Sequence, residues 1–155
     1  MDGLNKYVIP EKQPIPTFEE VTDEMAGATV FSELDIAKAF HQIEVAEESR
    51  HLLTFSTPKG LMRLKRLCMG FTSASEILQR IMSQVLCGLP GVRWVHDDII
   101  IFASNMAEHN QRLAACLDKL KLHNITLNPS KCKFGVKEAG FLAMRLSEKR
   151  NQPGQ

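Results

Sequence analysis

Three aspartates stand where apolar, strand-forming segments of the sequence give way to polar residues. Asp35 follows the apolar segment 29–34, and Asp97 and Asp98 lie between two later apolar segments. If these segments are neighbouring strands, the three carboxylates meet at one edge of a sheet. Carboxylates held close together repel one another and must be balanced by positive charge. Their hard oxygen atoms favour Mg²⁺, and a pair of such ions can activate a hydroxyl group and stabilise a leaving oxygen.

The same aspartates also have a purely structural interpretation. An Asp-Asp pair between two apolar strands makes a favourable hairpin turn, because short polar side chains suit turns. Asp35 could equally cap the short turn over Ile36–His41. Residue types alone therefore leave open whether the aspartates bind metal or shape turns.

Hydrophobic periodicity predicts the elements that would position these residues. The proline-containing segment up to Pro16 is expected to be extended. Thr17 and Glu20 form a capping box, which predicts that a helix starts there and stops at Gly27. The expected helices are 18–26, 73–87 and 106–123, and the expected strands are 29–34, 42–45, 51–56, 61–67, 92–96, 99–103, 125–128, 132–136 and 139–146.

The order of these elements predicts an α+β fold. The first strand, the two long helices, the central strand pair and the strand at 125–128 form a ferredoxin-like split βαβ–βαβ antiparallel sheet. The strands between 42 and 67 are an insertion after the first strand. The helices are expected to cover one face of the sheet and leave the other face open. In this arrangement the first strand lies beside the hairpin that carries Asp97 and Asp98.

The overall composition is ordinary for a globular protein. The chain has 155 residues, of which 44% are hydrophobic and 24% charged, and this length suits one domain. A net charge of +1 provides no global attraction to a polyanion, so binding to nucleic acid would depend on local patches. Arg63, Lys65 and Arg66 form one such patch on the expected strand 61–67. A solvated strand face is an equally good interpretation of these cations.

The cysteines and the N-terminal residues indicate the cellular compartment. Cys68, Cys87, Cys116 and Cys132 have no metal-like spacing, so free thiols in a reducing compartment are expected. The N-terminus holds no apolar segment of signal-peptide length, and no segment is long enough to span a bilayer. We therefore expect an intracellular protein, cytoplasmic or nuclear and not secreted, with no membrane partner.

Six phrases, in this order, resemble the reverse transcriptases of Ty3/gypsy-type long-terminal-repeat retrotransposons. The resemblance covers residues 4–147 and implies a polymerase palm with a partial fingers insertion, which leaves 148–155 as a frayed tail. The phrases are Phe31–Asp35 with Phe40–Ile43, Thr54–Gly60, Met69–Ala74 with Gln79–Arg80, Asp97–Phe102, Glu108–His109 with Leu127–Phe134, and Phe141–Leu142.

The resemblance implies a role for each matching residue. Asp35, Asp97 and Asp98 would hold two Mg²⁺ ions, for which Mn²⁺ is a possible substitute, and the main-chain carbonyl of Ile36 would be a further ligand. Phe40 would exclude a 2′-hydroxyl under the incoming sugar, although core packing is the plain alternative. Substrate contacts are implied for Met69, Gly70 and His96, primer contacts for Phe141, Leu142, Ala143 and Met144, and template contacts for Arg63, Lys65 and Arg66.

The sequence departs from the family pattern at several positions. Val95 and His96 replace the usual Tyr-x before the two aspartates, so the phenol that packs on the primer–template is lost. Cys68 and Ser75 each replace a proline, and Ala143 replaces a glycine that would tolerate positive φ. The fingers hairpin that clamps the triphosphate lies upstream of the matched segment, and the thumb and ribonuclease H regions lie downstream of it.

These observations leave three functional hypotheses. The first is a weak or inactive fragment of an RNA-directed DNA polymerase from a pol polyprotein, acting on deoxynucleoside triphosphates and a DNA primer on an RNA or DNA template. The second is a non-catalytic remnant, either a decayed element copy or a primer–template-binding module. The third is a Mg²⁺-dependent nuclease that uses the same carboxylates.

Overall fold

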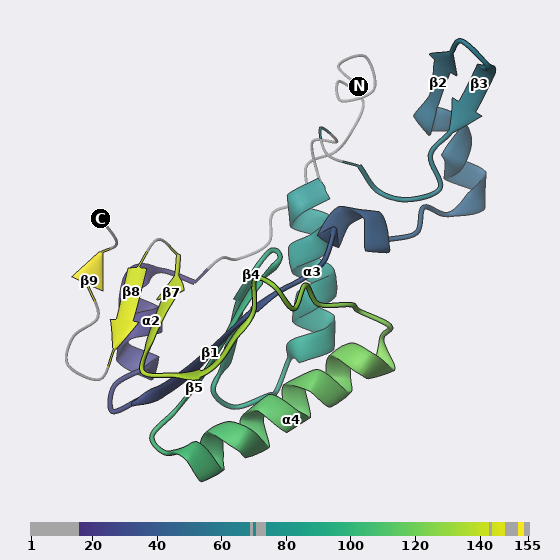
Figure 1. The fold of residues 1–155 in the computed structure, drawn as a ribbon. Coiled ribbons are helices and arrows are strands. Elements are labelled where there is room, and N and C mark those ends of the chain that lie inside the picture. The colour runs from purple at the N-terminus through teal and green to yellow at the C-terminus, as the bar shows by residue number, and fades with distance from the viewer. Residues whose placement is uncertain (1–15, 69, 71–73, 143, 148–151, 154–155) are drawn as a thin grey trace.

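An antiparallel sheet of four strands forms the centre of the structure, a computed structural model that describes residues 16–68, 70, 74–142, 144–147 and 152–153 (Figure 1). Neighbouring strands of this sheet are antiparallel, in the order β4-β5-β1-β6. This is the order of the ferredoxin-like split βαβ unit, so the predicted α+β fold is confirmed. The strands are β1 (Val30–Asp35), β4 (Val92–Val95), β5 (Asp98–Ala103) and β6 (Lys133–Val136).

Two amphipathic helices cover one face of this sheet. Helices α3 (Ala74–Leu86) and α4 (Met106–Leu122) confirm the two long predicted helices, except that residue 73 lies outside the described residues. Burying a Leu or Ile side chain stabilises by about 1.5–3 kcal/mol, so a shared apolar core holds the helices on the sheet. No helix in the described part of the chain is long and apolar enough to cross a membrane. The core includes Leu34, Leu78, Met82, Leu86, Ile99, Ile101, Cys116 and Leu120.

The opposite face of the sheet is covered at one end. There the short helix α2 (Phe18–Glu24) and the strand β7 (Glu138–Phe141) pack against the sheet. The expectation that the whole face stays open is wrong, because both elements have apolar side chains that this face buries. This second cluster joins Val21, Met25, Ala28, Phe31, Ile100, Phe102, Ala139 and Phe141.

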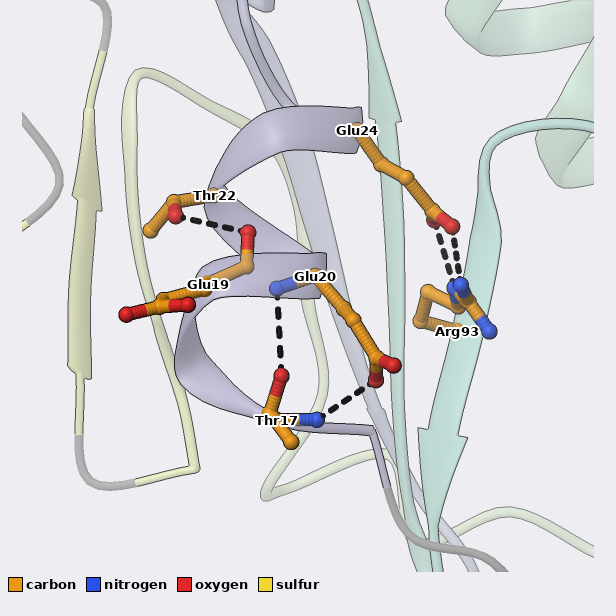
Figure 2. Close-up of polar contacts among 6 residues, drawn as sticks. All are labelled: Thr17, Glu19, Glu20, Thr22, Glu24 and Arg93. Atoms are coloured by element: carbon orange, nitrogen blue, oxygen red, sulfur yellow. Dashed lines mark hydrogen bonds and ion pairs between the residues drawn. The ribbon is translucent and has the colours of Figure 1, made fainter.

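Helix α2 begins with the predicted capping box (Figure 2). The amide N–H of Glu20 donates to the Thr17 hydroxyl at 3.3 Å, and the Thr17 N–H donates to the Glu20 carboxylate at 2.8 Å. At the other end of the helix, Glu24 forms a two-point ion pair with Arg93 of β4. Such an exposed pair contributes about 0.2–1 kcal/mol. The cap and the ion pair therefore fix the direction of α2, and its buried side chains supply most of the attachment.

The insertion after β1 forms an arm that stands apart from the sheet (Figure 1). It consists of the 3₁₀ helices η1 (Ala39–Gln42) and η2 (Glu47–Leu53), followed by the hairpin β2 (Thr54–Thr57) and β3 (Gly60–Arg63). Leu52, Phe55, Leu61 and Met62 are exposed on this arm. A two-stranded hairpin with little burial is marginal in isolation. Within the arm, β3 contacts η2, and η1 contacts α3.

Three predicted strands in this insertion are only partly correct. Segment 42–45 starts in η1 and then makes a single bridge, between Glu44 and Arg66. The first half of segment 51–56 lies in η2 and the second half in β2. Segment 61–67 is a strand only as far as Arg63. Isolated backbone hydrogen bonds join segments 42–45 and 61–67 without forming a continuous β-ladder. One of them is donated by the Val45 N–H to the Lys65 carbonyl at 2.8 Å.

The C-terminal segment differs most from prediction. Residues 125–128 do not form the fourth strand of the sheet, because Leu127 makes only one bridge, to Ile36, and β6 occupies the fourth position. A second sheet follows, with β7 paired to β8 (Met144–Ser147) and β8 paired to β9 (Gln152–Pro153). Part of the tail expected to fray is therefore paired. The expected extended N-terminal segment is outside the described residues up to residue 15.

Strand β6 contains a bulge beside β1. Phe31 pairs with Val136 but Glu33 pairs with Lys133, so β6 carries one extra residue over this interval. Gly135 adopts a φ of +59°, which glycine takes without strain. Its N–H donates to the buried Ser32 hydroxyl at 3.0 Å, and the same hydroxyl lies 2.6 Å from Nε2 of buried His109. A buried hydrogen-bonded chain from α4 therefore fixes the bulge.

Candidate active site

The pairing of β1 with β5 brings two of the predicted carboxylates together. Asp35 and Asp98 are direct cross-strand partners, so their side chains point to the same face of the sheet. This is the face opposite α3 and α4. The third carboxylate, on Asp97, lies in the turn between β4 and β5, and the Asp97 carbonyl accepts the N–H of Ile36 at 3.0 Å. The backbone thus places all three aspartates at one edge, as predicted.

The turn itself is displaced by one residue from the predicted turn. Val95 pairs with Asp98, so the turn residues are His96 and Asp97, and Asp98 is the first residue of β5. His96 adopts a φ of +52°, which is uncommon for a residue with a side chain. The reason is the short connection, because a two-residue hairpin turn requires positive φ in its centre.

A buried glutamine on α3 holds this turn, and sequence analysis gave it no role. The side-chain oxygen Oε1 of Gln79 accepts the N–H of His96 at 2.7 Å, and its side-chain Nε2 donates to the Trp94 carbonyl at 3.4 Å. The Gln79 side chain is 2% exposed. The available signal was an amide on the apolar stripe of a helix, since buried polar groups need hydrogen-bond partners. Gln79 therefore positions the strand end that carries Asp97 and Asp98.

A cleft of about 500 Å³ opens beside the carboxylates, within the size range of small-molecule sites. It unites the predicted residues Asp35, Ile36, Phe40 and Asp97. Phe40 also packs against the apolar core, so its two interpretations are compatible. Neither Asp98 nor His96 is among the described residues that line this cleft. The lining residues are Asp35, Ile36, Lys38, Ala39, Phe40, His41, Asp97, Asn128 and Lys131.

The carboxylates interact unfavourably with one another. Desolvation raises the pKa of the Asp98 carboxyl group, and the nearby charges of Asp97, Asp35 and Glu33 raise this pKa further. Lys131 acts in the opposite direction and lowers it. Sequence analysis gave Lys131 no role, because its position beside the cleft depends on the path of the chain before β6. At Asp98 the effect of Lys131 is smaller than that of desolvation and the three carboxylates together, so the pKa of Asp98 stays raised.

The donor atoms suit a hard cation such as Mg²⁺, since they are carboxylate and carbonyl oxygens. In the part of the chain that the structure describes, no group of three or more His, Cys, Asp or Glu side chains is arranged to hold a metal ion. Mg²⁺ usually keeps several waters and binds one or two carboxylates together with substrate phosphates. The residues present therefore fit the ion as part of a site that a substrate completes.

The backbone of Asp35 is held from the C-terminal side of the chain. Its N–H donates to Sγ of Cys132 at 3.5 Å, and its carbonyl accepts the N–H of Asn128 at 2.8 Å. The Gln42 side chain bonds to both the N–H and the carbonyl of Thr126. Segment 125–128, which does not form a strand, thus supports the cleft through individual hydrogen bonds.

The predicted primer-contact residues have unequal access. The Phe141 side chain is 4% exposed and lies in the core under α2, so its proposed contact with a primer is wrong for the side chain. Leu142 is half-buried and adopts a φ of +53°. It directly precedes Ala143, the position at which the family pattern has a glycine. Met144 starts β8, and Ala143 lies outside the described residues.

The remaining predicted residues lie on or near the arm. Arg63, Lys65 and Arg66 are exposed, and the Arg66 guanidinium donates to the Gln42 carbonyl at 3.1 Å. Arg66 is therefore partly engaged in structure, and both interpretations of this patch stand. Gly70 is exposed with a φ of +89°, and Met69 lies outside the described residues.

The fold and the position of the carboxylates define a polymerase palm. The chain belongs to the reverse transcriptase (RNA-dependent DNA polymerase) family, whose pattern matches residues 3–146. A retrovirus-related Pol polyprotein from transposon 297 of Drosophila melanogaster is 37% identical over 141 residues, which is 90% of this chain and 13% of that polyprotein. The transposon Tf2-3 polyprotein of Schizosaccharomyces pombe is 32% identical over 154 residues, which is 98% of this chain and 12% of that polyprotein. The predicted retrotransposon family is confirmed.

Solved structures agree on the fold. The foamy viral protease-reverse transcriptase in complex with double-stranded DNA superposes with a TM-score of 0.85 at 18% identity, covering 97% of this chain and 26% of that chain. The foamy viral protease-reverse transcriptase in complex with an RNA/DNA hybrid gives a TM-score of 0.83 at 17% identity, covering 97% of this chain and 21% of that chain. The chain spans about an eighth of the length of the Pol polyproteins it matches.

The role of Gln79 is testable by the near-isosteric change Gln79→Met. Loss of the bond to His96 leaves a backbone N–H without its partner, so we expect a loss of about 1–3 kcal/mol in unfolding free energy. The His96 amide should also exchange hydrogen faster. Denaturant unfolding and amide exchange measure these effects, with Gln84→Met on the exposed side of α3 as the control. Equal effects of the two changes would contradict the assignment.

The raised pKa of Asp98 predicts a pH-dependent gain in stability for Asp98→Asn. Because the fold disfavours the ionised form, the wild-type protein loses stability as pH rises through the ordinary carboxyl value of 3.8 and above it. The variant lacks this loss, so it should melt at a higher temperature at neutral pH, and the difference should vanish in acid. Thermal melts from pH 3 to 8 measure this, and Asp118→Asn, at an exposed position of α4, should show no such gain.

Proposed function

We propose that this chain forms the palm of an RNA-directed DNA polymerase and contributes its nucleotidyl-transfer site. The observation that carries the proposal is the Asp35–Asp98 cross-strand pair, with Asp97 in the adjoining turn and a cleft alongside. Asp35, Asp97, Asp98 and the carbonyl of Ile36 would hold two Mg²⁺ ions, with Mn²⁺ as a substitute. When bound, these ions would supply charge stabilisation to the attacking and leaving oxygens.

The proposed reaction extends a DNA primer by one nucleotide. The primer 3′-hydroxyl loses its proton to water, and its oxygen bonds to the α-phosphorus of a deoxynucleoside triphosphate. The bond between the α-phosphorus and the oxygen that bridges to the β-phosphate breaks, and pyrophosphate leaves. Lys131 faces the cleft and would offset negative charge on the triphosphate, as it offsets charge at Asp98. Phosphoryl transfer depends mainly on positioning and charge stabilisation, which the carboxylate edge and this lysine would provide.

Phe40 is proposed to select the sugar. Its ring forms part of the wall of the cleft that contains Asp35 and Asp97. An aromatic side chain at that place leaves no room for a 2′-hydroxyl, so deoxynucleotides would be preferred. Gly70, His96 and Met69 are proposed to complete the nucleotide site.

The proposed partners are a primer–template and the remainder of a pol polyprotein. The foamy viral enzyme with this fold has been solved with double-stranded DNA and with an RNA/DNA hybrid, which supports nucleic acid as the partner. Arg63, Lys65 and Arg66 would contact template phosphates, and the backbone from Leu142 to Met144 would contact the primer. Fingers, thumb and ribonuclease H regions would be contributed by other parts of the polyprotein.

Primer extension tests the proposal. On poly(rA)/oligo(dT) with Mg²⁺ or Mn²⁺ we expect weak extension by this chain, and Asp97→Asn should lower it at least about 100-fold, as loss of a charge-stabilising group commonly does. Asp118→Asn on α4 is the matched control and should leave extension unchanged. Extension that persists in Asp97→Asn would refute the site. Salt-dependent binding without extension would favour a non-catalytic primer–template module.

Sugar selection gives a second test. Phe40→Ala should raise incorporation of ribonucleotides relative to deoxynucleotides by about 10–200-fold, the range for a pocket contact that discriminates one small group. Single-nucleotide incorporation with each triphosphate measures this ratio. An unchanged ratio, with the variant still folded, would leave Phe40 as a packing residue only.

A further inference from the structure

Glu33 lies on β1 two residues before Asp35 and has no role in the proposed chemistry. The alternation of a strand places its side chain on the same face as Phe31 and Asp35. That face is apolar at Phe31 and acidic at Asp35, and Glu33 stands between the two. The Glu33 side chain is 19% exposed, so its charge is largely removed from water and requires partners.

Both oxygens of the Glu33 carboxylate have partners from the C-terminal part of the chain. Oε1 accepts a hydrogen bond from the backbone N–H of Gly140 in β7. Oε2 lies 3.5 Å from Nζ of Lys133 in β6. The Glu33 side chain thus joins β1 to both β6 and β7. The bond to Gly140 crosses between the central sheet and the second sheet.

The bulge in β6 is what makes Lys133 available to Glu33. In a regular ladder that pairs Phe31 with Val136, the residue opposite Glu33 would be Phe134. The extra residue shifts the register, so Lys133 takes this place and the exposed Phe134 does not. A bulge that changes the direction of one side chain in this way is a frequent feature next to active sites.

The contact with Gly140 fixes the hairpin formed by β7 and β8. Gly140 directly precedes Phe141, whose side chain is buried under α2, and Phe141 pairs with Met144 at the end of the hairpin. The hairpin is therefore attached to the body at two successive residues. Leu142 follows these two residues directly, so the bond to Glu33 constrains where Leu142 lies relative to Asp35 and Asp98.

We propose that Glu33 is a positioning residue that holds the β7–β8 turn at a set distance from the Asp35–Asp98 edge, and thereby places the primer strand. This inference rests on the proposed function, because it assigns the primer to that turn. Glu33 touches no reacting atom in this proposal. It acts through the Gly140 amide and is supported by Lys133.

Two variants of Glu33 separate the hydrogen bond to Gly140 from the negative charge of the carboxylate. Glu33→Gln keeps an oxygen that can accept from Gly140, whereas Glu33→Ala removes it. For Glu33→Ala we expect the Gly140 amide to exchange hydrogen about tenfold faster and the dissociation constant for a fluorescein-labelled primer–template to rise about tenfold, the effect of losing one charge-assisted bond. Glu33→Gln should restore most of both values. Glu47→Gln, on exposed η2, is the control.

The full chain is used, and amide exchange of Ile100 and Leu120 in the two cores verifies that each variant is folded. If Gly140 exchange does not change in Glu33→Ala, the contact does not hold the hairpin and the inference is overturned. If exchange rises but the wild-type affinity for the primer–template persists, Glu33 is only structural and the inference is again overturned. If the wild-type chain itself binds no primer–template at low salt, the proposed function fails, and the exchange of Gly140 still reports on the hairpin separately.

Discussion

The register between β1 and β5 is the constraint on which the rest of this structure depends. It sets Asp35 opposite Asp98 on one face and Leu34, Ile99 and Ile101 on the other, beneath α3 and α4. A shift of one residue would exchange the two faces, placing carboxylates in the core and branched apolar side chains at the cleft. The energetic cost of burying a charge makes that alternative inaccessible. The apolar residues therefore specify where the acidic ones lie, although they take no part in the chemistry.

The site is assembled against its own electrostatic repulsion. Asp98 is destabilised in its ionised form first by desolvation and then by three neighbouring carboxylates, and Lys131 compensates only in part. The interactions that hold this arrangement come from outside the charged cluster. Gln79 holds the turn from α3, and Asn128 and Cys132 hold the backbone of Asp35. The unfavourable charge energy is thus offset by packing and by neutral hydrogen bonds, and a bound cation would relieve it further.

Sequence patterns predict the parts of the fold that local physics determines. The apolar stripes of α3 and α4, the capping box at Thr17 and the apolar strands around Asp35 and Asp98 were all recognisable, because each pattern expresses its own burial. The fourth strand was misplaced, since a bulge at Gly135 and the single bridge of Leu127 depend on partners distant in sequence. The roles of Gln79, Lys131 and Glu33 were missed for the same reason. The burial of Phe141 is not predictable from local sequence, because it depends on α2 lying over the face of the sheet opposite α3 and α4.

The bulge in β6 has a consequence for the free edge of the sheet. Strand β6 is an edge strand, and a regular edge offers a row of N–H and C=O groups that another chain can extend. The extra residue breaks this row, because the Gly135 N–H is turned inward to the Ser32 hydroxyl. Exposed Lys133 and Lys137 add charge at either side of the irregularity, next to the apolar ring of Phe134. The irregularity that presents a lysine to Glu33 therefore also works against edge-to-edge aggregation.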